Sequence, residues 1–400
     1  MSRVCAERQN ETLVAIVAGE ASADLHGANL VKAIRELNPN VSFMGLGGPN
    51  MEAEGVKSVV PADKTAVVGL SEVFRKIGNI AKAYFGLRRI LRKLNPCLVI
   101  LLDYPEFNLK LASEAKKCGI PVMYYISPQV WAWRAGRVRK IASVVDRMVC
   151  ILPFEKEFYE KQGISVDYVG HPLCDIVPEE IDQGKLIVDL GLENNYPIVG
   201  LLPGSRDHEV ESLLPHMLGA IELLHDRYPS LGCVLPLAPT IKEDRIRELV
   251  KSSRVTVRIS RENIYALLSC CYCAMIASGT VTLQAAIAGL PMVIAYKVSP
   301  LTFFLGKRLV KVRHICLVNL VAGYEVVPEL IQSDVTPHNL ARHLINIIEN
   351  EKIRAEMKKG LEEVRRKLGG GGASRRAAEI ALQMIKSPVP DTKKNCPESP

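Results

Sequence analysis

Short apolar runs, each followed by a helical pattern, recur along almost the whole chain. Four of them contain only apolar residues and glycine: residues 13–17, Leu98–Leu102, Ile198–Leu202 and Cys273–Ala277. A strand that is apolar at every position is typical of a parallel sheet, because helices cover both of its faces. The alternation of such strands with helices therefore predicts an α/β protein built from doubly wound parallel sheets.

The length of 400 residues exceeds a single typical hydrophobic core, so we expect two domains of similar size. Pro178, acidic residues and Asn194-Asn195 interrupt the apolar pattern, which favours a boundary between Asp175 and Asn195. The predicted parts are a polar segment (1–12), an N-terminal Rossmann-like domain (13–180), a C-terminal domain (181–350), charged terminal helices (351–386) and a disordered tail (387–400).

The fourth apolar strand ends in a turn with the features of a phosphate-binding site. Ser278, Gly279 and Thr280 separate this strand from a helix that begins at Val281. Glycine lets an anion approach the backbone, and the first helical turn supplies N–H groups backed by the positive end of the helix dipole. An ordinary capped turn fits the same residues equally well, so the motif alone favours neither interpretation.

A second turn of this kind follows the third apolar strand. Gly204, Ser205 and Arg206 precede a helix that is predicted to begin at Asp207. The planar guanidinium of Arg206 suits a diphosphate, although a solvated cap residue is the alternative. Two phosphate-type turns in one half of the chain favour a nucleotide, bound where the carboxyl ends of parallel strands meet.

Carboxylates take the equivalent positions in the first half of the chain. Asp103 follows the second apolar strand directly, Glu106 lies three residues further on, and Glu20 lies in the predicted turn at 18–27. A carboxylate at a strand end is well placed to remove a proton from a substrate. Helix capping accounts for Asp103 and Glu106 equally well, and Glu20 fits a solvated turn, so spacing alone leaves their catalytic role open.

Positive charge is concentrated in two stretches that also contain large apolar residues. The net charge is +8, and residues 71–93 and 297–313 together hold more than this excess. The first stretch predicts a helix lying on an anionic membrane surface, and the alternative is a core helix with a basic outer face. The residues expected to contact lipid are Val67, Val68, Leu70, Val73, Phe74 and Ile77.

Other features of the sequence argue against several classes of protein. No apolar run approaches the ~20 residues of a membrane-spanning helix, and the first twelve residues lack the apolar core of a signal peptide. The 11 cysteines lack the paired spacing of metal ligands, which predicts reduced thiols, a cytoplasmic location and no metal site. No nucleic-acid-binding fold is recognisable, so nucleic acid is a poor candidate partner.

Six motifs together identify a family. They are Gly-Glu-Ala-Ser-Ala-Asp at 19–24, Tyr-Ile-Ser-Pro-Gln-Val-Trp-Ala-Trp at 125–133, Leu-Pro-Phe-Glu at 152–155, Val-Gly-His-Pro at 169–172, Leu-Pro-Gly-Ser-Arg at 202–206 and Ala-Ser-Gly-Thr at 277–280. From about residue 13 to about residue 383 the chain resembles the lipid A disaccharide synthases. The resemblance implies a GT-B fold, in which two Rossmann-like doubly wound domains face a central cleft and a final helix crosses back to the first domain.

The resemblance also implies a reaction. The family joins UDP-2,3-diacylglucosamine to 2,3-diacylglucosamine 1-phosphate through a β-1,6 bond and releases UDP, with inversion at the anomeric carbon and without metal or cofactor. It implies a cytoplasmic enzyme of a Gram-negative bacterium, peripherally associated with the inner membrane, and leaves a homodimer open. A sugar-nucleotide epimerase and an inactive nucleotide-sensing module at the membrane are the alternatives from other classes.

The resemblance assigns roles to individual residues, with Asp103 as the general base and Glu20 and Glu106 supporting it. The donor-binding residues are Gly204, Ser205, Arg206, Ser278, Gly279, Thr280, Gln284 and Asn319, and the acceptor-binding residues are Ser22, His26, Ser127 and Trp131. The chain departs from the family pattern at Glu106 and Gln284, which replace Asp and Glu, and at Tyr324, which replaces Arg. The last change removes a cation.

Overall fold

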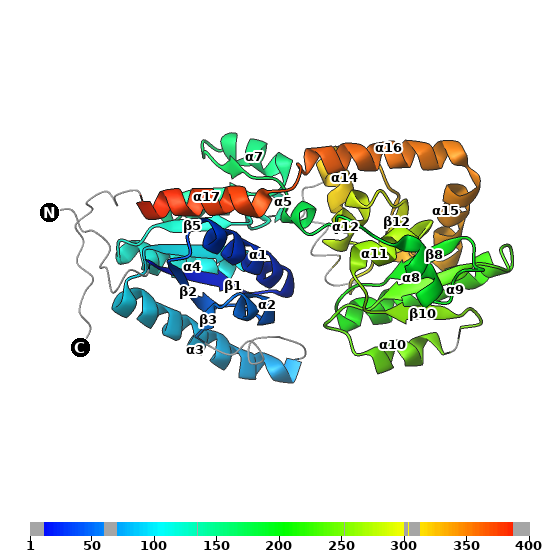
Figure 1. The fold of residues 1–400 in the computed structure, drawn as a ribbon, viewed down its shortest axis with the longest axis horizontal. Coiled ribbons are helices and arrows are strands. Elements are labelled where there is room, and N and C mark those ends of the chain that lie inside the picture. Colours follow the sequence, from blue (N-terminus) through cyan, green and yellow to red (C-terminus); the bar gives the residue numbers. More distant parts are fainter. Residues whose placement is uncertain are drawn as a thin grey trace. The chain divides into compact units, whose positions relative to one another are not determined.

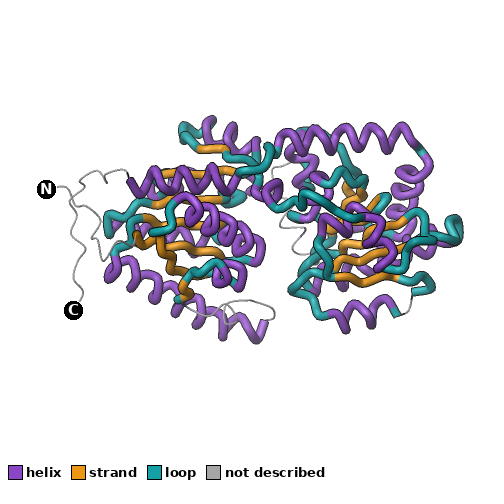
Figure 2. The backbone as a smooth tube through the Cα atoms, in the orientation of Figure 1, coloured by secondary structure: helices purple, strands orange, loops and turns teal. Residues whose placement is uncertain are grey.

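The computed structural model describes residues 12–59, 70–133, 135–251, 253–299, 303 and 313–386. It contains two compact α/β units, Met1–Asp175 with Gly369–Pro400 (unit 1) and Ile176–Leu368 (unit 2). Each unit has one sheet, and the strands of both sheets are parallel throughout, with helices packed around them (Figure 2). The prediction of doubly wound parallel sheets is confirmed.

Unit 1 contains a seven-stranded sheet in the order β3-β2-β1-β4-β5-β6-β7. The strands are β1 (Thr12–Ala18), β2 (Val41–Leu46), β3 (Lys57–Ser58), β4 (Leu98–Leu102), β5 (Val122–Tyr125), β6 (Arg147–Cys150) and β7 (Asp167–Tyr168). The helices are α1 (Ala21–Leu37), α2 (Pro49–Ala53), α3 (Leu70–Leu94), α4 (Pro105–Lys117), α5 (Val130–Trp133), α6 (Val138–Val144), α7 (Pro153–Glu160) and α17 (Ala373–Lys386) (Figure 1). Every residue of β4 is buried, as its uninterrupted apolar sequence predicts.

Unit 2 contains a six-stranded sheet in the order β10-β9-β8-β11-β12-β13. The strands are β8 (Ile198–Leu202), β9 (Gly232–Pro236), β10 (Val257–Ser260), β11 (Cys273–Ala277), β12 (Met292–Tyr296) and β13 (Glu329–Ile331). The helices are α8 (Gln183–Asp189), α9 (Asp207–His225), α10 (Glu243–Val250), α11 (Ile264–Cys270), α12 (Val281–Ile287), α14 (Leu317–Ala322), α15 (Pro337–Glu349) and α16 (Glu351–Lys367). All residues of β8 and β11 are buried.

The two terminal helices belong to different units, although we expected both to be one C-terminal element. The apolar face of α16, which includes Leu361 and Val364, packs against α12 and α14 of unit 2. Helix α17 packs against α1 of unit 1 (Figure 1). The carboxylate of Asp175 accepts hydrogen bonds from the N–H groups of Gly372, Ala373 and Ser374, so it caps the start of α17.

Helix α3 has a core face, which agrees in part with the alternative interpretation of this stretch. Ala83, Leu87 and Leu91 are 1% exposed and lie within the core of unit 1. Arg88 and Arg92 form ion pairs with the buried carboxylate of Glu114, so these two basic residues interact with unit 1 itself. Of the residues expected to contact lipid, Val67 and Val68 lie outside the described residues, as do the side chains of Leu70, Val73, Phe74 and Ile77.

Among the helices that the structure describes, none combines the length and apolarity needed to cross a bilayer. Eight cysteines of the same set are free thiols, but Cys97 is disulfide-bonded. The expectation that the cysteines are uniformly reduced is therefore wrong at Cys97.

Candidate active site

The candidate carboxylates of unit 1 lie where the strand order reverses direction. Strands β1 and β4 are neighbours, Ala18 pairs with Leu102, and β2 and β5 lie on their outer sides. Ligands of open α/β sheets bind outside the carboxyl ends of the strands at such a switch point. Glu20 and Asp103 follow these two strands directly, so the fold brings both carboxylates to the expected edge.

The backbone at Asp103 and Tyr104 is left-handed, with φ of 46° and 47°. Non-glycine residues rarely adopt this conformation, and each such residue costs on the order of 1 to 3 kcal/mol unless its surroundings hold it in place. The carbonyl oxygen of Asp103 is held by Asn108 Nδ2 at 2.7 Å and Tyr124 Oη at 2.5 Å. Strain that neighbouring side chains maintain at a strand end is a common feature of active sites.

Tyr104 also explains the glycine of the first motif. A Cβ atom added to Gly19 would lie 2.6 Å from Cγ of the Tyr104 ring. The ring of Tyr104 stacks in turn on Phe107, with 5.3 Å between their centroids. Gly19 is therefore required for this ring to pack across the end of β1.

The environment of Asp103 favours a role as a proton acceptor. Burial, and after it the negative charge of Glu20, raise the pKa of its carboxyl group to about 6, although a hydrogen bond from the Tyr104 backbone acts in the opposite direction. A base with a pKa just below neutrality is ionised at physiological pH and still accepts a proton readily. Helix capping does not explain Asp103, because Tyr104 occupies the N-cap position of α4 and makes no side-chain capping bond.

Glu106 lies in the first turn of α4 and is less suited to act as the base. Its side chain is 66% exposed and forms an ion pair with Arg137, which precedes α6. This contact joins the start of α4 to the segment that follows α5.

The turn after β11 is open to a ligand in the structure. Among the residues that the structure describes, no atom would lie within 4 Å of a Cβ atom added to Gly279, and this glycine does not have a positive φ, so neither packing against them nor conformation requires glycine there. Thr282 Oγ1 donates to the carbonyl of Gly279 at 2.7 Å, which stabilises the turn from within the helix. Ser278 Oγ donates to Ile315 at 3.4 Å. The space above Gly279 suits the close approach of an anion.

The turn after β8 differs from the phosphate cradle that the sequence suggested. Glu209 Oε2 accepts hydrogen bonds from the N–H groups of Ser205 at 2.9 Å and Arg206 at 3.2 Å, so these donors are occupied. Gly204 has φ of 120°, and an added Cβ would lie 2.4 Å from Glu209. The sequence analysis missed Glu209, although its position three residues after the N-cap is the spacing of a capping box. The Arg206 side chain, 62% exposed, remains the candidate ligand of this turn.

The predicted acceptor residues divide into accessible and buried pairs. Ser22 is exposed in the first turn of α1 and Trp131 is half-buried in α5, so both can meet a substrate. Ser127 is 3% exposed and is hydrogen-bonded to Tyr159 Oη at 2.7 Å. His26 is 4% exposed, because the turn expected at 18–27 is already helix from Ala21 onward.

His26 packs edge-on against His171, with 5.9 Å between the ring centroids. Burial lowers the pKa of His26 to about 4 and that of His171 to about 3. Both rings are neutral side chains of the core, and His26 and Ser127 are buried in this structure, so their predicted contact with the acceptor stays a prediction.

Asn319, predicted to bind the donor, is used within the fold in this structure. It is fully buried, its Nδ2 donates to Glu329 Oε1 at 2.7 Å and to the Val327 carbonyl, and its Oδ1 accepts from the N–H groups of Val326 and Val327. Glu329 accepts in turn from the N–H of Ile315, the residue whose carbonyl meets Ser278. Asn319 and Glu329 therefore shape the loop beside the Ser278 turn from inside.

The two remaining departures from the family pattern lie in the same unit. Gln284 is half-buried in α12, one turn beyond Thr280. Tyr324 is 46% exposed, donates to Glu363 at 2.8 Å, and lines a cavity of about 380 Å³ with Arg313 and His314. The cationic side chain of Arg313 thus lines the same cavity as Tyr324, where the family pattern has an arginine.

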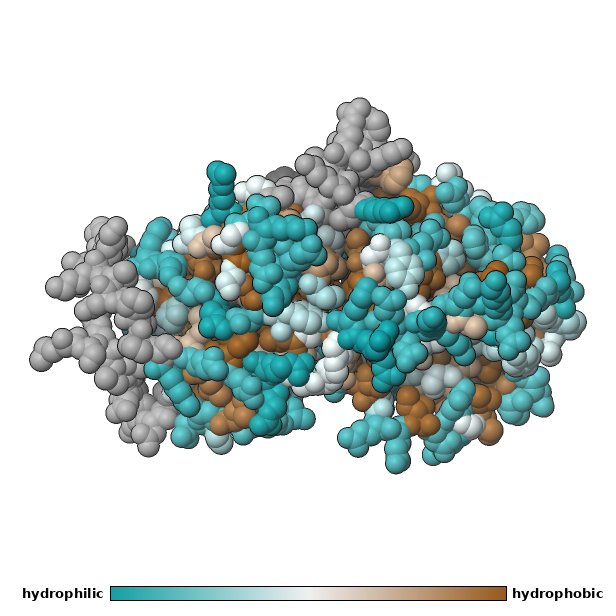
Figure 3. Space-filling model, turned by 90° about the horizontal axis from the view of Figure 1, so that it is seen from above, coloured by the Kyte–Doolittle hydropathy of each residue, from teal (hydrophilic) through white to brown (hydrophobic). Residues whose placement is uncertain are grey.

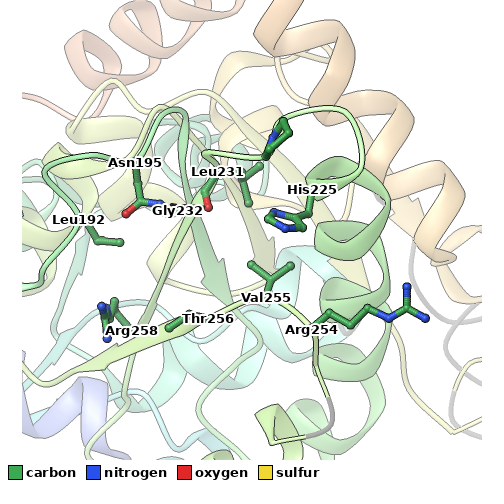
Figure 4. A pocket seen from close by; sticks show the side chains of 10 residues that line it. Leu192, Asn195, His225, Leu231, Gly232, Arg254, Val255, Thr256 and Arg258 are labelled. Carbon is green, nitrogen blue, oxygen red and sulfur yellow. Dashed lines mark hydrogen bonds between the residues drawn. The ribbon is translucent and has the colours of Figure 1, made fainter.

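A separate cavity of about 230 Å³ lies at the opposite edge of the unit 2 sheet. Figure 4 shows its lining, which includes Asn195, His225, Val255 and Arg258. Asn195 precedes β8 and Val255 precedes β10, so this cavity adjoins the amino ends of the strands. Ligands of open parallel sheets bind at the carboxyl ends, so this cavity does not belong to the candidate site.

The sequence matches the family described as lipid-A-disaccharide synthetase over residues 14–385. The lipid-A-disaccharide synthase of Geobacter metallireducens is 49% identical over 376 residues, which cover 93% of this chain and 97% of the relative. The lipid-A-disaccharide synthase of Coxiella burnetii is 40% identical over 372 residues, which cover 93% of this chain and 98% of the relative.

Solved structures with the same architecture are more distant in sequence. MnaA of S. aureus, in a co-structure with UDP, matches with a TM-score of 0.65 and 14% identity over 94% of this chain and 98% of that chain. MurG of Acinetobacter baumannii matches with a TM-score of 0.58 and 14% identity over 93% of this chain and 99% of that chain. At this identity the likeness establishes the fold alone, and it confirms the expected GT-B class.

Proposed function

Because the chain belongs to the lipid-A-disaccharide synthetase family, it is a glycosyltransferase of lipid A biosynthesis, and we propose that it takes its sugar from UDP-2,3-diacylglucosamine. The acceptor is 2,3-diacylglucosamine 1-phosphate, and the product is the β-1,6-linked disaccharide 1-phosphate with release of UDP. The single observation that carries the proposal is the position of the candidate residues. Asp103 in unit 1 and the Ser278 and Gly204 turns in unit 2 each follow a strand at the switch point of its sheet.

Asp103 removes the proton of the acceptor 6-hydroxyl in this proposal. The resulting oxygen attacks the anomeric carbon of the donor from the side opposite the diphosphate, the bond from that carbon to the phosphate oxygen breaks, and the configuration is inverted. The proton ends on Asp103 and the electron pair leaves with UDP. Arg206 and the N–H groups of the Ser278 turn stabilise the charge that develops on the diphosphate.

An epimerase is the main alternative, since the UDP-GlcNAc 2-epimerase of Neisseria meningitidis matches with a TM-score of 0.63. Its identity to this chain is 15%, which supports a shared fold and no shared reaction. An epimerase would keep the nucleotide on its product. Release of UDP that requires both acylated sugars therefore separates the transferase from the epimerase and from a nucleotide-sensing module.

The pH dependence of the reaction should report the titration of Asp103. Because burial and Glu20 raise its pKa to about 6, kcat/KM is expected to fall tenfold per pH unit below about pH 6 and to level off above it. Glu20→Gln removes one of the two causes, so the inflection should move to lower pH. Glu155 also titrates near neutrality, but Glu20 is not among the causes of its shift. If the inflection stays at the same pH in Glu20→Gln, the group that titrates there is not Asp103.

We propose that the enzyme associates peripherally with the inner membrane through α3. The exposed residues Lys82, Phe85, Arg89 and Lys93 recur at helical spacing opposite the core face and form one line, the α3 stripe. Phe85 is 60% exposed and lies in line with the three basic residues. Basic residues around an exposed apolar side chain are typical of helices that bind anionic lipid.

Removal of the α3 stripe should abolish sedimentation with anionic liposomes. Each Lys or Arg near such a surface contributes about 1 kcal/mol, so Phe85→Ser with the three basic residues changed to Gln should reduce binding more than a hundredfold. Helix α16 lies on the face seen in Figure 3, where hydrophilic and hydrophobic residues are interspersed, and it supplies a matched control. The control variant is Ile353→Ser with Lys352, Lys358 and Lys359 changed to Gln. Equal losses in both variants would mean that net charge, and not α3, determines binding.

A further inference from the structure

The Leu-Pro-Phe-Glu motif at 152–155 has no role in the reaction described so far. It follows β6, and Glu155 lies in the first turn of α7 with 1% of its surface exposed. Strands β4, β5 and β6 are neighbours, because Leu102 pairs with Tyr125 and Tyr125 pairs with Val149. Asp103, the segment 126–131 and Glu155 therefore follow the carboxyl ends of three adjacent strands.

The two oxygens of the Glu155 carboxylate accept from different parts of this edge. Oε1 accepts from Nε1 of Trp131 at 3.1 Å. Oε2 accepts from the N–H groups of Leu152 at 3.1 Å and Ile151 at 3.3 Å. The Trp131 ring also meets the ring of Phe154 edge-on, with 4.8 Å between the centroids. The motif thus fixes the indole of Trp131 by one hydrogen bond and one aromatic contact.

The segment that carries Trp131 is held under strain. Ile126 has φ of 68°, an outlier for a β-branched residue, and its N–H donates to the Val149 carbonyl at 3.0 Å. Ser127 is anchored to Tyr159 of α7. Burial, with a smaller effect of the charge of Asp103, raises the pKa of Glu155 to about 7, against the hydrogen bonds from Leu152, Trp131 and Ile151 that lower it. The effect of Asp103 agrees with the position of the two carboxylates on a common edge.

We propose that Glu155 is a positioning residue for the acceptor sugar, acting through the hydrogen bond that orients Trp131 at the sheet edge that carries Asp103. This inference rests on the proposed transfer reaction, in which Trp131 contacts the acceptor. A half-buried indole offers an apolar face against which a sugar ring can pack. A small error in the position of a bound reactant is costly, so a residue that fixes this face contributes without touching the substrate.

The chemistry requires a carboxylate at this position. Both oxygens of Glu155 face N–H donors, and a glutamine has only one oxygen. In Glu155→Gln the amide nitrogen therefore faces either the Trp131 N–H or the backbone N–H groups, and one contact becomes repulsive. Trp131→Phe removes the indole donor, so the glutamine oxygen can then serve the backbone without conflict.

The test is a double-mutant cycle on the full-length enzyme with both acylated sugars. Glu155→Gln should raise KM for the acceptor about tenfold or more, with KM for the donor unchanged, since a lost hydrogen bond to a charged group has an effect of this size. Trp131→Phe should raise the same constant, and the double variant should be no worse than Trp131→Phe alone. The matched control is Glu157→Gln, an exposed residue of the same helix that pairs with Lys161 and should have no effect.

Fluorescence supplies a readout that does not depend on turnover. The chain has two tryptophans, so Trp131 is the sole reporter in Trp133→Phe. In that background Glu155→Gln should shift the emission of Trp131 to longer wavelength and Glu157→Gln should not.

Additive effects of Glu155→Gln and Trp131→Phe on the acceptor KM, or unchanged emission, would overturn the proposal. If Glu155→Gln fails to fold, the Trp131→Phe variant still tests the proposal. An unchanged acceptor KM in Trp131→Phe contradicts the role of the indole. A wild-type enzyme that releases no UDP with both sugars would refute the proposed function itself, and the positioning role with it. These failures are distinguishable, because only the last one affects the wild type.

Discussion

Asp103→Asn is expected to reduce kcat by about a hundredfold to ten-thousandfold while leaving the affinity for the UDP-sugar unchanged. This range is typical for the loss of a general base. The substitution keeps the shape of the side chain and removes its basicity. The contacts that hold the left-handed backbone, from Asn108 and Tyr124, go to the main-chain oxygen of Asp103 and survive the change. Steady-state kinetics with both acylated sugars, together with UDP binding by calorimetry, measure the two effects separately.

Glu106→Gln is the appropriate comparison for this variant. Glu106 is exposed and paired with Arg137, so its loss should have a smaller effect on kcat than the loss of Asp103. Near-normal turnover of Asp103→Asn, with a large loss of kcat in Glu106→Gln, would identify Glu106 as the general base in place of Asp103.

Arg206→Ala is expected to reduce kcat/KM for the UDP-sugar about a hundredfold or more. The loss of one donor to the charge that develops on a leaving group costs roughly 3 kcal/mol. The backbone donors of this turn are occupied by Glu209, so the guanidinium is the part of the turn that can reach a diphosphate. Its Nη1 lies 3.4 Å from Glu209 Oε1 on an exposed surface, and such a pair contributes little to stability.

Arg247→Ala is a matched control, because Arg247 is 64% exposed and pairs with Glu243 one helical turn away. This variant should retain wild-type kinetics. Both variants should unfold at nearly the wild-type temperature. If the activity of Arg206→Ala lies within a few-fold of the wild type, Arg206 does not stabilise the leaving group.

The strand ends were predictable because apolar runs are a strong local signal. The runs that end at Leu102, Leu202 and Ala277 correspond to β4, β8 and β11 to the residue, and the helix at Asp207 begins where the turn predicts. Residues placed directly after a parallel strand must lie at one edge of its sheet. The edge that carries Asp103 therefore followed from the pattern alone.

The direction of side chains within helices was not predictable in the same way. Ser22 and His26 both lie in the turn predicted at 18–27, yet only Ser22 is exposed, because α1 begins at Ala21 and turns His26 into the core. Asn319 has the residue type of a ligand, but the loop that follows α14 uses its amide completely. Burial of a polar residue depends on tertiary packing, which a single sequence does not display.

Contacts between residues that are far apart in the sequence could not be predicted from the local pattern either. The left-handed conformation is uncommon for Asp103 and Tyr104, and the carbonyl of Asp103 is held by Tyr124 from the next strand. The bond between Trp131 and Glu155 joins two motifs that the sequence shows as unrelated. Both features belong to the candidate site, where tertiary contacts override local preference.

The most direct test of the account is an assay of UDP release in which each acylated sugar is supplied alone and then together, with the lipid product identified by mass spectrometry. We expect UDP to appear only with both sugars, in equal amount to a disaccharide 1-phosphate with a β-1,6 bond. UDP release from the donor alone, or a product that keeps its nucleotide, would contradict the proposed transfer.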